Sequence, residues 1–156
     1  MIRSKPWIVT VPGILLLGWL SGWFSNSGYG NAWFDALVKP GFMPPAWAFP
    51  VAWTALYILM GIAVAQVMGS ESPVRRLALH VFAIQLLLNL LWSPIFFGLH
   101  RADLALVTIG VLTLFVAVTI LLFWSLRRSA ALLMLPYLAW LLFATVLNFA
   151  IVRLNG

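Results

Sequence analysis

One polar stripe interrupts an otherwise apolar stretch of the sequence. Gln85, Asn89 and Trp92 are spaced by four and three residues, and such residues lie one above another on one face of a helix. An amide that faced lipid would leave its donors and acceptors unpaired, at a large cost in free energy. Both amides are therefore expected to point into the protein. There they could either bond to other helices or orient the polar edge of a ligand, and the stripe alone favours neither role.

Two further stripes combine a large aromatic residue with smaller residues on the same helical face. They are Trp53, Tyr57 and Gly61, and Trp140, Ala144 and Asn148. Small residues let helices approach closely, and they also leave room between aromatic walls, as a planar ligand requires. Three such stripes favour a shared cavity. For any one aromatic residue, core packing or a place at the membrane interface is still the more common role.

Ionisable residues are too few and too scattered for most kinds of catalysis. The only acidic residues are Asp35, Glu71 and Asp103, and none falls in the middle of an apolar run, where a proton-driven exporter usually embeds its coupling site. His80 and His100 are twenty residues apart, about 30 Å along a helix, so they cannot clamp one metal or haem iron. With no catalytic triad or metal-spaced cluster, we expect no conventional hydrolase or oxidoreductase, no metal and no cofactor.

The composition is that of a membrane protein. Of 156 residues, 64% are apolar and 8% charged, and the mean hydropathy is +1.07, against roughly 45–50% and about 25% in soluble domains. A soluble fold of this size could not bury so much apolar surface. The net charge of +6 is spread in ones and twos between apolar blocks. This pattern suits loop ends and anionic headgroups, and we expect no nucleic-acid partner.

Five apolar blocks are each long enough to span a bilayer as a helix. They are Trp7–Phe24, Ala46–Met68, Leu77–Gly98, Leu104–Leu126 and Ala130–Val152. The last three links are short and force neighbouring spans to run antiparallel. We therefore predict an all-α membrane protein, a five-helix bundle forming one domain over residues 1–156.

The first block could instead be a signal peptide, since Arg3 and Lys5 precede it. Aromatic residues, including Trp19 and Trp23, occupy the place of a cleavage site, which favours a retained helix. The segment Ser25–Pro45 is the only long link. It is too apolar for a disordered linker, and we expect it to pack as a lid over the bundle.

Basic residues indicate the orientation of the bundle. Six of them fall on the side of the N-terminus and of the second and fourth loops: Arg3, Lys5, Arg75, Arg76, Arg127 and Arg128. Three fall on the opposite side: Lys39, Arg101 and Arg153. This difference predicts a cytoplasmic N-terminus, and all-helical spans suit the cytoplasmic membrane of a bacterium.

Special residues within the spans leave two further questions open. Pro50, Pro94 and Pro136 could bend their helices, either to widen a cavity or to shape the packing. Gly18 and Gly22 form a small-xxx-small pair, which permits helix contact within the bundle or between protomers.

Four ordered motifs resemble the tryptophan-rich sensory protein and translocator family, also called TspO/MBR. They read W-F-D-A-L-V-K-P from Trp33, P-P-x-W-x-F-P-x-x-W-x-x-x-Y from Pro44, Q-x-x-x-N-x-x-W-x-P-x-F-F from Gln85, and P-Y-x-x-W-x-x-x-A-T-x-x-N from Pro136. The resemblance covers nearly the whole chain. It implies a five-helix bundle, commonly a homodimer, with the first loop over a cavity that binds porphyrins such as protoporphyrin IX or haem.

The resemblance also implies roles for individual residues. Trp53 and Trp140 match cavity tryptophans linked to porphyrin binding and to light-driven porphyrin breakdown. The other predicted ligand contacts are Trp33, Lys39, Trp47, Tyr57, Gln85, Asn89, Trp92, Phe97, Ala144 and Asn148, with Lys39 a candidate for attracting propionates. Phe42 replaces a tryptophan that is frequent in the family loop, and it lacks the indole donor that such a tryptophan would offer a ligand. Phe149 replaces the tyrosine of a sterol motif, so we do not expect cholesterol as the ligand.

Three functions follow as hypotheses. The first is a receptor or translocator that binds tetrapyrroles, with a sensory or transport role. The second is light-dependent porphyrin degradation through Trp53 and Trp140, in which case these two residues would be catalytic. The third is an interaction protein that needs no ligand and would use the surface around Gly18 and Gly22.

Overall fold

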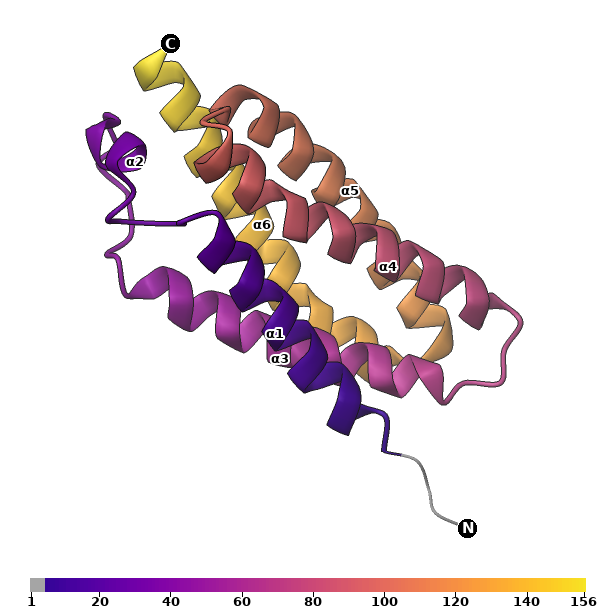
Figure 1. Ribbon diagram of the computed structural model, residues 1–156. Helices are drawn as coiled ribbons and strands as arrows, with labels where there is room; N and C mark the ends of the chain where they lie inside the picture. Colours follow the sequence, from indigo (N-terminus) through magenta and orange to yellow (C-terminus); the bar gives the residue numbers. More distant parts are fainter. Residues whose placement is uncertain (1–4) are drawn as a thin grey trace.

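Five long apolar helices run alongside one another in the computed structural model, which describes residues 5–156 (Figure 1). They are α1 (Trp7–Phe24), α3 (Ala48–Met68), α4 (Val74–Ser93), α5 (Ala102–Leu126) and α6 (Arg128–Asn155). A short helix, α2 (Ala32–Ala36), lies in the first loop, and a π-helical turn, η1 (Pro94–Gly98), extends α4. Among the described residues, five helices are long and apolar enough to cross a membrane. The predicted all-α membrane bundle is confirmed.

With η1 counted as the end of α4, the predicted spans match the five long helices to within three residues at each end. The first is predicted without error, whereas α4 begins at Val74 and α6 at Arg128, earlier than the apolar blocks do. The added residues are partly polar, such as Arg75 and Arg76, because a helix continues past the apolar stretch until its backbone conformation changes. Arg3, which entered the charge count, lies outside the described residues.

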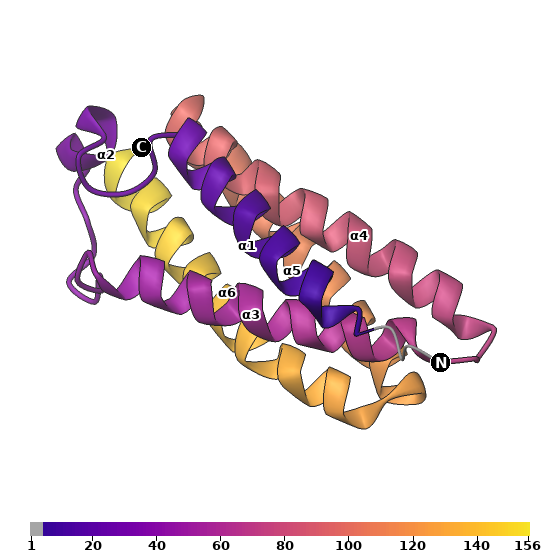
Figure 2. The same ribbon diagram turned by 60° about the horizontal axis from the view of Figure 1, so that its bottom comes forward.

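The helices form a ring around the interior of the bundle. Along this ring α1 packs on α3, α3 on α6, α6 on α5 and α5 on α4, while α4 and α1 meet more loosely. Both views place α2 and the C-terminus at one end of the bundle and the start of α1 at the other (Figures 1 and 2). Helices α1 and α3 diverge toward the end of the bundle where α2 lies.

Two glycines set the close approach of α1 and α3. A Cβ on Gly18 would collide with the ring of Tyr57, and one on Gly61 would lie 2.6 Å from the backbone of Val11. At the same crossing the Thr10 hydroxyl donates to the carbonyl of Gly61 at 2.7 Å. Gly18 therefore serves contact within the bundle, one of the two roles that its spacing left open.

A proline marks the change from α4 to the π-helical turn. The amide of Leu99 donates to the carbonyl of Pro94 at 2.9 Å, a separation of five residues, and such π turns are frequent at functional sites. Pro50 lies in the first turn of α3, where helix amides lack intrahelical partners and no bond is lost. Pro12 and Pro136 lie inside α1 and α6.

The first loop folds into an ordered segment. Gly28 and Gly30 have φ of 87° and 98°, a left-handed conformation that favours glycine. Asn31 then caps α2, since its side-chain oxygen accepts from the amide of Phe34 at 3.2 Å. At the other end of α2 the Lys39 ammonium donates to the carbonyl of Phe34 at 2.7 Å.

This loop is fixed to the bundle on two sides, as a packed lid requires. On one side Asn31 donates to the carbonyl of Phe97 at 3.2 Å, and Phe34, 3% exposed, packs edge-on against Phe97. On the other side the amide of Asn155, at the end of α6, pairs with the backbone of Val38. The lid predicted over Ser25–Pro45 is confirmed as a folded segment, and the side chains at its centre belong to the protein's core.

Candidate functional site

A cavity of about 710 Å³ lies between the five long helices, beneath the lid. Its walls come from the half of each helix nearer to α2, with Tyr29, Phe34 and Met43 contributed by the loop. Pockets for drug-sized ligands typically measure about 300–1,000 Å³. The cavity is therefore large enough to hold a sizeable organic ligand, and most of its lining is apolar.

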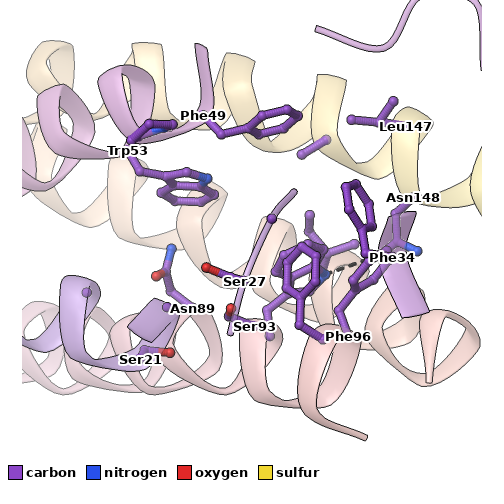
Figure 3. Close-up of a pocket in the computed structure, with 18 of the residues that line it drawn as sticks. Ser21, Ser27, Phe34, Phe49, Trp53, Asn89, Ser93, Phe96, Leu147 and Asn148 are labelled. Atoms are coloured by element: carbon purple, nitrogen blue, oxygen red, sulfur yellow. Dashed lines mark hydrogen bonds between the residues drawn. The ribbon is translucent and has the colours of Figure 1, made fainter. Parts of the chain in front are cut away.

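Aromatic rings form one wall of the cavity. The rings of Trp53 and Trp140 are 6.4 Å apart at 83°, and Tyr57 stacks on Trp53 at 5.5 Å. Figure 3 shows Trp53 and Phe49 on one side of the space, with Asn89 on the other. Trp53 lies on α3 and Trp140 lies on α6. Each stands at one end of the stripe that its helix turns toward the interior. A flat apolar ligand fits against such a wall.

A chain of hydrogen bonds forms the deep end of the cavity and links α3, α4 and α6. The Tyr57 hydroxyl donates to Asn89 Oδ1 at 2.9 Å, and Asn89 Nδ2 donates to the Tyr137 hydroxyl at 2.8 Å. That hydroxyl donates in turn to Gln85 Oε1 at 2.9 Å. All four side chains are buried. These hydrogen bonds pair polar side-chain groups that would otherwise be buried without partners, and they fix the orientation of Tyr57 and Asn89.

A second polar connection lies closer to the lid. The Trp92 indole Nε1 donates to Asn148 Oδ1 at 3.1 Å, and Asn148 Nδ2 donates to the carbonyl of Ala102 at 2.9 Å. Trp92 also stacks on Phe96 at 4.9 Å. These contacts join the start of α5 to α4 and α6, so the mouth of the cavity is held by both polar and aromatic contacts.

One buried polar atom in this region has no partner. Of the buried side-chain nitrogen and oxygen atoms in residues 5–156, only Trp140 Nε1 makes no hydrogen bond within the protein. Trp140 lines the cavity. A buried donor without a partner costs about 1–3 kcal/mol, and such a group in a native fold calls for an explanation. The nitrogen itself has almost no accessible surface, so neighbouring atoms shield it, and Trp140 faces the cavity with other atoms of its ring.

The structure places eight of the twelve predicted contact residues in the cavity wall. These are Trp53, Tyr57, Asn89, Trp92, Phe97, Trp140, Ala144 and Asn148. Seven of them come from the three helices that carry the predicted stripes, and Phe97, assigned from the resemblance, comes from the π turn. Ligand binding by any of them stays a prediction.

The other four predicted residues do not line the cavity. Gln85 is fully buried behind it, bonded to Tyr137. Trp33 stacks on His100, with ring centroids 4.8 Å apart, and packs edge-on against Phe96. Trp47 is 68% exposed, and the Lys39 ammonium is bonded to carbonyls at the end of α2. Gln85, Trp33 and Lys39 thus make contacts within the protein, and Trp47 is open to the surroundings.

Sequence reasoning assigned no role to Tyr137, which completes the deep hydrogen-bond chain. Its spacing of three residues from Trp140 places it on the same helical face as the Trp140 stripe, and that signal was available. Phe34 and Phe96 line the cavity, but no periodic pattern marked them. Phe42, which stands where the family loop often has a tryptophan, is half exposed and packs against Phe143.

A profile of the TspO/MBR family matches residues 9–154. The chain belongs to the TspO/MBR family. The protein CrtK of Rhodobacter capsulatus is 46% identical over 127 residues, covering 80% of this chain and 79% of that protein. The tryptophan-rich protein TspO of Archaeoglobus fulgidus is 40% identical over 151 residues, covering 96% of each chain.

The family also reaches animals. The human translocator protein is 34% identical over 157 residues, covering 97% of this chain and 93% of that protein. These similarities confirm the predicted resemblance. The chain is an integral membrane protein of the TspO/MBR type, whose relatives carry the names of sensory and translocator proteins.

Proposed function

We propose that this TspO/MBR protein binds a flat hydrophobic ligand of the tetrapyrrole type in the cavity beneath its lid, in a sensory or transport role. The observation that carries the proposal is the wall that the rings of Trp53, Tyr57 and Trp140 form in a mostly apolar cavity. A macrocycle can stack against the ring of Trp53 or of Trp140. The cavity volume of about 710 Å³ supports a ligand of this size.

Binding is tested with protoporphyrin IX and the purified protein in detergent. The shift of the porphyrin's main absorption band is the readout, because it does not depend on the protein's own fluorescence. Trp140→Phe keeps an aromatic ring but has a smaller stacking surface, and the loss of about 0.5–1.5 kcal/mol of aromatic contact weakens binding by about 2- to 10-fold. The double variant Trp53→Phe, Trp140→Phe weakens it further.

Trp124→Phe is the matched control. Trp124 is exposed at the end of α5 away from the lid, so its replacement leaves the affinity unchanged. If the double variant bound protoporphyrin IX as tightly as the wild type does, the aromatic wall would not be the binding surface. If the double variant bound as tightly as the wild type and Trp124→Phe bound more weakly, the binding site would lie at the other end of the bundle.

We also propose that the N-terminus lies in the cytoplasm of a bacterium. The end of the bundle away from the lid carries Lys5, Arg75, Arg76, Arg127 and Arg128 with Glu71, whereas the lid end carries Lys39, Arg101 and Arg153 with Asp35 and Asp103. Anionic headgroups and the positive-inside rule favour the first end in the cytoplasm.

The chain has no cysteine, which makes this orientation simple to test. A membrane-impermeant maleimide added to intact cells labels Ala36→Cys in the lid and spares Glu71→Cys. The opposite labelling would contradict the orientation. The homodimer implied by the resemblance is also a proposal, measured by light scattering of the purified protein.

A further inference from the structure

Three arginines gather at the end of the bundle away from the lid. Arg76 lies in the first turn of α4, Arg127 lies between α5 and α6, and Arg128 begins α6. All three are exposed. The one ion pair within residues 5–156 joins Arg101 to Asp103 at the opposite end of the bundle. The charges of the three arginines are therefore not balanced by a carboxylate of the described chain.

Packing of α4 against α5 brings these arginines to the same level of the bundle. The rings of Phe82 on α4 and Phe123 on α5 stack with their centroids 5.9 Å apart. Arg76 precedes Phe82 by six residues, about 9 Å of helix, and Arg127 follows Phe123 by four residues, about 6 Å. Both views place the start of α4 beside the turn between α5 and α6 (Figures 1 and 2). Arg76, Arg127 and Arg128 thus form one arginine cluster.

The other charged groups at this end leave the arginine cluster positive. Glu71 is the only acid there; it is exposed in the link before α4 and forms no ion pair with a described residue. Lys5 adds a further positive charge, and Arg75 donates to the carbonyl of Ser70 at 2.7 Å. An excess of positive charge attracts anions, and the planar guanidinium group matches the geometry of phosphate oxygens.

A tryptophan holds one member of the cluster at the height of lipid headgroups. The Arg128 guanidinium lies over the ring of Trp124, 5.4 Å from its centroid. Tryptophan is enriched where a membrane meets water, and Trp124 is about half exposed. A guanidinium that stacks by its face keeps its N–H groups at the edge, where they can donate to phosphate oxygens. Arg128 is therefore placed at the membrane surface with its donors available.

Apolar side chains continue from the arginine cluster along the spans. Leu77 follows Arg76 on α4 and is 56% exposed, and Leu121, one turn before Trp124 on α5, is 71% exposed. Both belong to helices that are long and apolar enough to cross a membrane. A molecule that carries a phosphate group and hydrocarbon chains matches both parts of this surface, whereas a free anion matches the cluster alone.

We propose that Arg76, Arg127 and Arg128 bind the headgroup of an anionic phospholipid. The phosphate oxygens accept hydrogen bonds from the guanidinium groups, and the acyl chains lie along Leu77 and Leu121. Basic residues beside a membrane-spanning helix bind anionic headgroups in this manner. The site lies at the end of the bundle opposite the lid, so it depends neither on the cavity nor on the proposed function.

Native mass spectrometry of the purified protein tests this site, because it counts bound lipids and gives their dissociation constants. Dioleoyl phosphatidylglycerol is the anionic probe, and dioleoyl phosphatidylcholine has the same acyl chains and phosphate but no net charge. We expect the wild type to bind phosphatidylglycerol about tenfold more tightly or better. A smaller preference would overturn the inference.

The variants remove the cluster one charge at a time. Each of Arg76→Gln, Arg127→Gln and Arg128→Gln is expected to raise the dissociation constant for phosphatidylglycerol about fivefold, equivalent to about 1 kcal/mol. The affinity for phosphatidylcholine is expected to change less than twofold or so. Wild-type affinity for phosphatidylglycerol in the double variant Arg76→Gln, Arg127→Gln would overturn the inference.

The matched control removes the same charge from the lid end. Arg101 and Arg153 lie there and are both exposed, so the double variant Arg101→Gln, Arg153→Gln is expected to bind phosphatidylglycerol within about twofold of the wild type. If it weakened binding as much as the double variant of the cluster does, net charge alone would attract the lipid, and the inference would fail.

Two soluble competitors distinguish a lipid from a free anion. Inorganic phosphate and glycerophosphoglycerol, the headgroup without acyl chains, both lack the hydrocarbon that packs along the spans. We expect neither to displace bound phosphatidylglycerol at a concentration equal to that of the lipid. Displacement by either would overturn the lipid assignment and indicate a site for free phosphate. None of these results bears on porphyrin binding, so the proposed function is judged separately.

Discussion

The side-chain amide of Asn155 pairs with both backbone polar groups of Val38, which lies 117 residues earlier in the chain. Asn155 Nδ2 donates to the Val38 carbonyl and the Val38 amide donates to Asn155 Oδ1, each at 2.8 Å. On α6 this residue follows the cavity-lining Asn148 and Ile151 along the same side of the helix. One helix therefore both lines the cavity and fastens the lid.

Replacing this amide is predicted to loosen the lid. Asn155→Ala removes two hydrogen bonds, each worth about 0.5–1.5 kcal/mol, so local opening of the lid becomes easier by about 1–3 kcal/mol. Hydrogen exchange measures the effect, with faster exchange expected at Val38 and faster release of bound protoporphyrin IX.

Asn155→Asp is the matched variant for this prediction. It keeps an acceptor for the Val38 amide but loses the donor, so its exchange rate at Val38 is expected between those of wild type and Asn155→Ala. Exchange in the middle of α4 serves as an internal control and stays unchanged. Equal protection of Val38 in all three proteins would mean that the lid is held by its aromatic contacts alone.

The contact between Gly18 and Tyr57 predicts a strong dependence on side-chain size. Gly18→Ala forces a methyl group into the Tyr57 ring, and overpacking of this kind costs about 1–3 kcal/mol. We expect a lower midpoint of thermal unfolding in detergent. Gly13→Ala is the control on the same helix, because no atom lies within 4 Å of its added Cβ. A Gly18→Ala protein as stable as Gly13→Ala would contradict the observed packing.

The buried hydrogen-bond chain separates residues that support the cavity from residues that face it. Gln85→Leu leaves the Tyr137 hydroxyl without its acceptor, at a cost of about 1–3 kcal/mol, but Gln85 does not line the cavity. We expect a lower unfolding midpoint with the dissociation constant for protoporphyrin IX unchanged within about twofold.

Asn89→Leu is expected to change both quantities. Asn89 bonds to Tyr57 and Tyr137 and also lines the cavity, so its loss lowers the unfolding midpoint and weakens binding. If Gln85→Leu weakened binding as much as Asn89→Leu does, the ligand would reach behind the hydrogen-bond chain.

Most of the fold could be predicted because the bilayer restricts the possible structures. In a membrane each backbone group must be satisfied within its own helix, so apolar length alone defines the five spans. Helical spacing then placed Asn89 in the interior, since an amide cannot face lipid without unpaired polar groups, and it placed Trp53 and Trp140 on the same faces as small or polar residues. Cavity residues that belong to regular helices are thus accessible from sequence.

The loop and its contacts were harder to predict. Trp33 and Lys39 were assigned to the site from the resemblance, yet their positions depend on how the lid folds. Lys39 turns back to the carbonyl of Phe34 because the end of a helix leaves such groups unpaired. The π turn before Leu99, which aims Phe96 and Phe97 at the lid, has no periodic signature in the sequence. Contacts between non-periodic segments must be read from the structure.

The most direct test of the account is to fill the cavity and measure protoporphyrin IX binding. Ala144 lines the cavity, whereas Ala139, on the same helix, lines a shallow groove on the outer face between α3 and α6. We predict that Ala144→Phe raises the dissociation constant by about tenfold or more and that Ala139→Phe leaves it within about twofold of wild type. Wild-type affinity in a stably folded Ala144→Phe protein would contradict binding in this cavity.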